Sequence, residues 1–111
     1  MTLDQVHYFL ALCRELNFTR AARLCGISQP SMTNAIGALE AELGAPLFHR
    51  SPQVRLSEFG ERIKPVFQRI EAAAGEIQLL AEPARLAAHR PAGKPQIRGE
   101  MDAVVTPLPG T

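Results

Sequence analysis

Residues Thr19–Leu43, TRAARLCGISQPSMTNAIGALEAEL, predict a short helix, a tight turn and a second, longer helix. Thr19 is a candidate N-cap, because its hydroxyl can accept hydrogen bonds from the free N–H groups of a first turn. Gly26 can adopt the left-handed conformation that ends a helix and redirects the chain. Ser28 can then cap the second helix, with Pro30 in its first turn, where a missing N–H costs little. This order of signals is typical of a helix-turn-helix.

The second predicted helix has an apolar stripe and a polar surface. Four apolar residues recur at spacings of four, three and four, as on the buried face of an amphipathic helix: Met32, Ile36, Leu39 and Leu43. The residues left outward or near the N-terminal end are small, uncharged and mostly polar: Gln29, Ser31, Thr33, Asn34 and Gly37. Such a surface suits a helix that enters the major groove of DNA, where Gln or Asn can pair with an adenine edge. A solvated face in a small helical bundle has the same pattern, so the residues alone leave both interpretations open.

The segment from residue 18 to residue 50 closely resembles the DNA-binding end of LysR-type transcriptional regulators. The matches are FTRAA at 18–22, SQP at 28–30, LE at 39–40 and GAPLFHR at 44–50. The resemblance covers about residues 1 to 90 and implies a winged helix-turn-helix that binds double-stranded DNA. The residues predicted to contact DNA are Thr19, Arg20, Ser28, Gln29, Pro30, Ser31, Thr33, Asn34, Arg50 and Arg55.

The second predicted helix departs from the family pattern at its centre. Many family members carry basic residues just after the position of Thr33, where this chain has Asn34, Ala35, Gly37 and Ala38. A glycine inside a helix costs about 1 kcal/mol relative to alanine. The loss of phosphate-binding charges should lower the affinity for DNA and its dependence on salt. Specific reading of bases by the polar side chains of this helix remains open.

The segment before the helix-turn-helix predicts a further helix. Thr2 and Gln5 have the spacing of a capping box, so this helix should begin at about Leu3. Its inner stripe consists of Val6, Phe9, Leu10 and Cys13, with Leu16 and Phe18 at the far end. The helix should brace the helix-turn-helix, and Tyr8 is predicted to be a half-buried part of this scaffold and not a DNA contact.

A two-stranded wing is expected after the helix-turn-helix. The segments LFHR at 47–50 and QVRL at 53–56 flank Ser51-Pro52, a predicted turn. Arg50 and Arg55 are the two charges on this wing, and basic wing residues usually reach phosphate or the minor groove. The alternative is two solvated arginines on a hairpin. The family motif ends in arginine and so favours a DNA contact at Arg50.

The residues after Ser57, a predicted cap, indicate a long helix with a sustained apolar seam. The seam has alternating spacings of four and three and consists of Phe59, Ile63, Val66, Ile70, Ala73, Ile77, Leu80 and Ala84. As a helix, the stretch from Phe59 to Leu80 would span about 30 Å, longer than the face of so small a body. A second copy is therefore the expected partner, and the linker helix of LysR-type regulators also makes an antiparallel dimer contact. Pro65 should kink this helix, and Pro83 should end or bend it.

The chain is predicted to be mainly α-helical, with three parts. Residues 1–57 form the winged helix-turn-helix, with a three-helix core and a two-stranded wing; residues 58–90 form the linker and dimerisation helix; residues 91–111 form a flexible tail. In LysR-type regulators an effector-binding domain follows the linker helix. Here no small-molecule effector is expected, and both a fragment of a longer regulator and a naturally short protein remain open.

Composition argues against several other classes of protein. The net charge is only +1, and residues 1–56 contain five arginines and four carboxylates, so phosphate contacts must come from a local patch. No apolar run reaches about 18 residues and no signal-peptide pattern opens the chain, so a cytoplasmic location without membrane contact is expected. Cys13 and Cys25 are predicted to be free and buried. No phosphate loop, metal-ligand spacing or nucleophile–base pair appears, so no enzyme activity, metal or cofactor is expected.

The predicted function is sequence-specific binding of double-stranded DNA by a homodimer that regulates transcription. The linker helices would set the distance between two recognition helices at about 34 Å, one turn of the duplex. The alternative is an interaction protein that forms a heterodimer with a full-length relative and modulates its assembly. The apolar seam and the weak basic charge motivate this second hypothesis.

Overall fold

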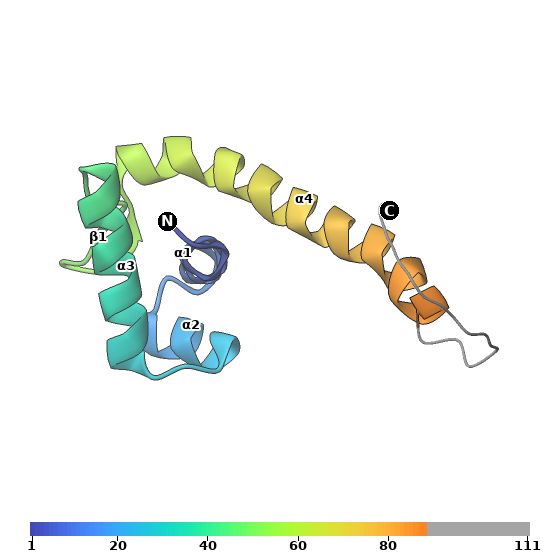
Figure 1. Ribbon diagram of the computed structural model, residues 1–111. Helices are drawn as coiled ribbons and strands as arrows, with labels where there is room; N and C mark the ends of the chain where they lie inside the picture. Colours follow the sequence, from blue (N-terminus) through green and yellow to red (C-terminus); the bar gives the residue numbers. More distant parts are fainter. Residues whose placement is uncertain (89–111) are drawn as a thin grey trace. The chain divides into compact units, whose positions relative to one another are not determined.

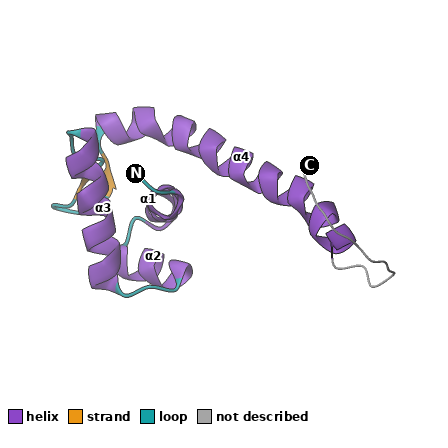
Figure 2. Cartoon of the chain, viewed as in Figure 1, coloured by secondary structure: helices purple, strands orange, loops and turns teal. Residues whose placement is uncertain are grey.

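The computed structural model describes residues 1–88, and within them it has the predicted mainly helical architecture (Figure 1, Figure 2). In chain order the elements are α1 (Leu3–Glu15), α2 (Phe18–Cys25), α3 (Gln29–Leu43), β1 (Phe48–His49), β2 (Arg55–Leu56) and α4 (Glu58–Ala88). One compact unit spans Met1–Glu76, and a second unit begins at Ile77. The predicted tail at 91–111 and the last two residues of the predicted linker helix lie outside the described residues.

Helix α1 begins as predicted but ends differently. The backbone N–H of Gln5 donates to the Thr2 hydroxyl at 3.1 Å, and the N–H of Thr2 donates to the Gln5 side chain at 2.9 Å, which confirms the capping box. Leu16 caps the other end with a left-handed backbone, φ +50°, and its side chain is 44% exposed. The expectation that Leu16 closes the apolar stripe is therefore wrong, because Leu16 adopts the left-handed cap conformation at the helix end and its side chain stays exposed.

The cap of α2 corrects the sequence prediction. Asn17, and not Thr19, is the N-cap: its side-chain oxygen accepts from the Arg20 backbone N–H at 2.8 Å, and the helix begins at Phe18. Asn is as good an N-cap as Ser or Thr, and starting here lets Phe18 pack against the core. Thr19 lies in the first turn and is exposed.

The turn between α2 and α3 follows the prediction (Figure 1). Gly26 is left-handed at φ +71°, and its N–H bonds back to α2. Ser28 caps α3 by accepting from the backbone N–H of Ser31 at 3.2 Å, and Pro30 lies in the first turn. At the other end of α3, Gly44 is left-handed at φ +89°. These caps confirm the helix-turn-helix.

The core lies between the three short helices, the wing and the first part of α4. The ring of Phe9 is central: its centroid lies 5.4 Å from that of Phe48 in β1 and 5.1 Å from that of Phe67 in α4. Such offset and edge-to-face pairs add about 0.5–1.5 kcal/mol beyond burial of their area. The buried apolar residues are Val6, Phe9, Leu10, Ala11, Leu12, Ala21, Ala22, Met32, Ile36, Leu39, Leu47, Phe48 and Phe67.

The wing is a short antiparallel hairpin in which Phe48 pairs with Leu56 and His49 with Arg55. Each strand has two residues, fewer than predicted. Ser57 joins the wing to α4: its hydroxyl donates to the carbonyl of Pro46 at 2.7 Å and accepts from the N–H of Gly60 at 2.9 Å. The predicted cap at Ser57 is therefore confirmed.

The first half of α4 packs on its own unit with a different phase from the predicted seam. Phe59, Ile63 and Ile70 are partly buried against the core, but Phe67 takes the place expected for Val66. Phe67 is 3% exposed and Val66 is 40% exposed. The buried stripe therefore has spacings of four, four and three, because α4 is rotated so that Phe67 meets Phe9.

A polar contact also joins α1 to α4 inside this unit. The Nδ1 atom of His7 lies 2.9 Å from Oε2 of Glu71, and both side chains are partly exposed. This contact lies on the same helix pair as the Phe9–Phe67 ring contact. Two contacts of different chemistry thus fix the first half of α4.

Beyond Glu76, helix α4 keeps its helical backbone to Ala88. Neither Pro65 nor Pro83 interrupts it, so the expected end at Pro83 is not found. Both prolines are exposed, which lets water reach the carbonyl groups that lose their N–H partners.

Candidate nucleic-acid interface

The first two turns of α3 present a continuous polar surface. Its apolar side is closed, because Met32, Ile36 and Leu39 are fully buried. The six residues of this segment predicted to contact DNA are all exposed: Ser28, Gln29, Pro30, Ser31, Thr33 and Asn34. The structure thus brings these six residues together at the N-terminal end of a helix supported by α1 and α2.

Hydrogen bonds within α3 organise this surface. The Gln29 amide donates from Nε2 to the Thr33 hydroxyl at 2.7 Å, across one helical turn. The Ser28 hydroxyl donates to the Ser31 hydroxyl at 2.9 Å. The carboxamide oxygen of Gln29 stays available as an acceptor for an incoming donor. Asn34 lies one position further, and its side chain makes no hydrogen bond within residues 1–88.

The two predicted contacts at the start of α2, Thr19 and Arg20, belong to a different helix from this surface. Thr19 is exposed in the first turn of α2. Arg20 turns back to the end of α1, where Nε lies 3.3 Å from Oε1 of Glu15 and Nη2 donates to the Glu15 carbonyl at 3.1 Å. Its charge is therefore partly neutralised within the fold.

Arg50 and Arg55 differ, although both are exposed on the wing. The guanidinium of Arg50 bonds to both carboxylate oxygens of Glu40 at 3.1 Å and to the carbonyl of Phe48 at 3.0 Å. Its Cζ also lies 5.3 Å from the ring centroid of Phe18. Arg55 has no ion pair within the described part of the chain. A freely solvated Arg50, one of the two sequence-based alternatives, is therefore wrong.

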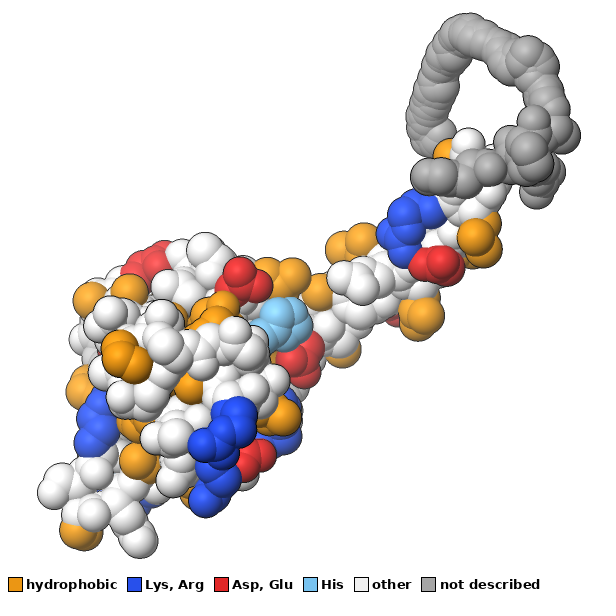
Figure 3. Space-filling view, turned by 90° about the horizontal axis from the view of Figure 1, so that it is seen from below, with side chains coloured by type: hydrophobic (Ala, Val, Ile, Leu, Met, Phe, Trp, Pro, Cys, Tyr) orange, Lys and Arg blue, Asp and Glu red, His pale blue; other side chains and the backbone are white. Residues whose placement is uncertain are grey.

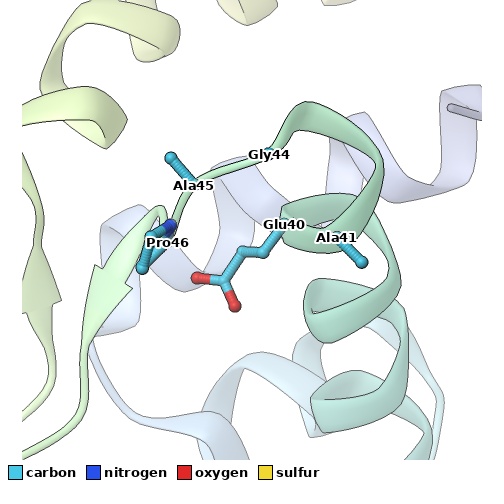
Figure 4. Close-up of a pocket in the computed structure, with 5 residues that line it drawn as sticks. All are labelled: Glu40, Ala41, Gly44, Ala45 and Pro46. Atoms are coloured by element: carbon cyan, nitrogen blue, oxygen red, sulfur yellow. The ribbon is translucent and has the colours of Figure 1, made fainter.

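Glu40 is the residue of this region that the sequence prediction missed. It lies on α3 beside a shallow hollow lined by Ala41, Gly44, Ala45 and Pro46 (Figure 4). In Figure 4 the Glu40 side chain points away from α3, towards the side where Ala45 and Pro46 lie. The LE pair in the family motif pointed to Glu40, but a motif gives no partner. The partner, Arg50, is ten residues away.

The cysteines give no sign of a reactive centre. Cys13 and Cys25 are free and half-buried, and burial raises the pKa of the Cys13 thiol to about 11. No group of three or more His, Cys, Asp or Glu side chains suited to a metal ion occurs within residues 1–88. None of the helices described there is long and apolar enough to cross a membrane.

A three-helix body, a short hairpin and an exposed polar helix capped at Ser28 define the winged helix-turn-helix class of DNA-binding proteins. Residues 3–61 match the family model described as the bacterial regulatory helix-turn-helix protein, lysR family. The chain belongs to this family of DNA-binding transcription regulators, as its sequence motifs suggested.

Curated relatives agree with this assignment. The chain is 50% identical over 62 residues to the HTH-type transcriptional regulator BudR of Klebsiella aerogenes, a match that covers 55% of this chain and 43% of the relative. It is 43% identical over 76 residues to the probable cat1 operon transcriptional activator of Acinetobacter lwoffii, covering 64% of this chain and 25% of the relative. The chain thus spans less than half the length of these regulators.

Solved structures share the fold. Full-length OxyR C199D from Pseudomonas aeruginosa superposes with a TM-score of 0.72 and 38% identity, over 75% of this chain and 28% of the other. The CbnR DNA-binding domain, solved in a complex with DNA, superposes with a TM-score of 0.68 and 33% identity. That match covers 80% of this chain and all of the CbnR domain. The predicted winged helix-turn-helix followed by a long helix is confirmed.

Proposed function

We propose that this chain binds double-stranded DNA sequence-specifically as a homodimer, with α3 of each protomer in a major groove. The observation that carries the proposal is the exposed surface of Ser28–Asn34 on a helix whose opposite side is fully buried. Its similarity to the CbnR DNA-binding domain, which was solved with DNA, supports the same use here. Binding to chromosomal DNA would place the protein in the cytoplasm.

Gln29 is the side chain proposed to read a base. Its bond to Thr33 fixes the amide before DNA arrives, so little side-chain entropy is lost on binding. A carboxamide can pair in two places with an adenine edge, a contact worth about 1–3 kcal/mol. Asn34 provides a second carboxamide, and Ser31 a hydroxyl that suits either base or phosphate.

The proposed homodimer uses the outer part of α4. Ile77 and Leu80, two residues of the predicted seam, are 66% and 75% exposed, and Leu79 and Leu86 are exposed beside them. The space-filling view shows hydrophobic side chains along this part of the helix (Figure 3). Exposed apolar groups in such number indicate a contact with another chain. Phe59, Ile63 and Ile70 already pack within their own protomer, so the proposed dimer contact is shorter than the full predicted seam.

The test is fluorescence anisotropy against a mixed pool of duplexes and one fixed non-specific duplex, over a salt series. Retained duplexes should share a two-fold sequence and bind two protomers. Gln29→Ala should weaken specific binding by about 1–3 kcal/mol and leave non-specific binding nearly unchanged. Gln68→Ala, an exposed glutamine on α4, is the matched control and should change neither. Equal loss of both kinds of binding in Gln29→Ala would remove the base-reading role.

The same exposed apolar surface of α4 supports a second candidate, a heterodimer with a full-length relative. Such a pair would alter how the relative assembles. Co-expression of this chain with a full-length regulator, followed by pull-down, tests it. Recovery of homodimers alone would count against heterodimer formation.

A further inference from the structure

The carboxylate of Glu40 joins the end of α3 to the wing. Its Oε2 accepts from the backbone N–H of Leu47 at 2.6 Å and of Phe48 at 3.2 Å, the residues that open the hairpin. Both oxygens also bind Arg50, at the far end of β1. The Glu40 side chain is only 15% exposed, so these bonds lie in a partly dry environment. One carboxylate thus holds both ends of the first wing strand.

Arg50 is held by three hydrogen bonds and one ring contact within its own chain, although its side chain is 40% exposed. Nη1 donates to Glu40 and to the Phe48 carbonyl, Nη2 donates to Glu40, and the guanidinium lies over the Phe18 ring. A bidentate arginine–carboxylate pair is among the stronger hydrogen-bonded contacts and has a fixed geometry. To reach a phosphate with the same fork, Arg50 would have to give up these bonds.

Arg55 offers the contrasting case on the neighbouring strand. It pairs with His49 in the hairpin, is exposed, and has no ion pair within residues 1–88. Its charge is therefore available to a phosphate at no cost in existing bonds. The two arginines of the wing differ in chemistry although they are both exposed basic residues.

We propose that Arg50 is a positioning residue, which through Glu40 fixes the wing against α3, and that Arg55 makes the cationic contact of the wing with DNA. The inference rests on the proposed DNA-binding function. It predicts that Arg50 acts on DNA only through the placement of the wing. The conservative variant Arg50→Lys keeps the charge and loses the planar fork, so it separates placement from charge.

The first experiment needs no DNA. Amide hydrogen exchange of Leu47 and Phe48 is measured by NMR in the free chain, for wild type, Arg50→Lys and the matched control Arg55→Lys. We expect exchange at least tenfold faster in Arg50→Lys and unchanged in Arg55→Lys. Unchanged exchange in Arg50→Lys would overturn the positioning role, whether or not the chain binds DNA.

The second experiment measures DNA affinity over a salt series, at a temperature where circular dichroism shows every variant folded. Arg55→Gln should lower the slope of log K against log salt by about 1 in wild type. In the Arg50→Lys background, Arg55→Gln should lower the DNA affinity less than twofold, because the wing is no longer held in place. A variant that is merely less stable would not alter the effect of Arg55→Gln.

The double variant Glu40→Gln/Arg50→Gln completes the test because it keeps the net charge of the wild type. We expect severalfold weaker binding with a salt slope lowered by about 1, because the released wing no longer holds Arg55 against a phosphate, and adding Arg55→Gln to the double variant should lower the slope no further. A further fall of about 1 in that triple variant would show that Arg50 and Arg55 bind phosphate independently and would overturn the proposal. If the wild type binds no duplex, the proposed function fails, and the exchange experiment still decides the role of Arg50.

Discussion

The backbone of Gly60 lies so close to the wing that a Cβ atom there would be 2.2 Å from the carbonyl oxygen of Leu47 and 2.7 Å from a methyl group of Leu56. Real Cβ atoms do not approach backbone oxygens this closely. The first turn of α4 and the start of the wing therefore meet through a position that only glycine fits.

Gly60→Ala should consequently destabilise the unit, by about 1–3 kcal/mol, as an overpacked core does. Gly75→Ala is the matched control on the same helix: no atom lies within 4 Å of its added methyl group. That change should stabilise by about 0.5–1 kcal/mol, because alanine is the better helix former. Urea unfolding followed by far-ultraviolet circular dichroism measures both. If both substitutions changed the free energy of unfolding in the same direction, the close contact between Gly60 and the wing would be contradicted.

Gly37 on α3 has room for a side chain, since nothing lies within 4 Å of an added Cβ. Gly37→Ala should raise the free energy of unfolding by about 0.5–1 kcal/mol. Its methyl group continues the i, i+4 row of Gln29 and Thr33, so specific DNA affinity should fall at least threefold. Thermal unfolding and anisotropy on the selected duplex check the two effects. Higher stability with unchanged affinity would place Gly37 away from the DNA.

Phe67→Ala tests whether the first half of α4 belongs to the core. Because Phe67 is buried against Phe9, its truncation should cost about 3–5 kcal/mol of unfolding free energy. Val66→Ala, the exposed neighbour in the predicted seam, should cost less than about 1 kcal/mol. Both are measured by urea unfolding at several protein concentrations, so that dimer formation is separated from folding. A larger loss for Val66→Ala would restore the predicted seam.

Leu16 has a left-handed backbone conformation, which glycine adopts more readily than leucine. The left-handed conformation costs a non-glycine residue about 1–2 kcal/mol. Glycine removes this cost but also makes the unfolded chain more flexible, which offsets part of the gain in stability. Leu16→Gly should therefore stabilise by about 0.5–1 kcal/mol. Leu24→Gly, at an exposed leucine inside α2, should destabilise by a similar amount. Differential scanning calorimetry compares the melting temperatures. A lower melting temperature for Leu16→Gly than for the wild type would show that the backbone of Leu16 is not strained.

The Cys13 thiol predicts a loss of stability in alkaline solution. Burial raises its pKa from 9.0 to about 11 in the folded chain. Between about pH 9 and pH 11 the unfolded chain has lost this proton while the folded chain keeps it, so the free energy of unfolding falls as pH rises. The fall should be smaller in Cys13→Ala, which keeps only the contribution of Cys25, whose pKa burial also raises. The free energy of unfolding is measured by denaturant titration at several pH values in this range. An equal fall with pH in wild type and Cys13→Ala would contradict the contribution of Cys13.

Local signals explain what could be predicted. The capping box at Thr2, the left-handed Gly26 and the cap at Ser28 each act within a few residues of chain. The apolar periodicity of α3 likewise shows directly which side is buried, because a short helix on a three-helix body has one apolar side. The cap of α2 was the exception: Asn17 and Thr19 are both good caps, and the packing of Phe18 against the core selects the earlier start.

The sequence by itself therefore determined the helix-turn-helix, the hairpin, the exposed polar surface of α3 and the family. The tertiary structure alone decided that Arg50 binds Glu40, that Phe67 and not Val66 faces Phe9, and which part of α4 stays exposed. The physical reason is the range of the interactions. Caps and periodicity depend on neighbours one turn away, whereas the rotation of a long helix and the partner of a long side chain depend on the body against which they pack.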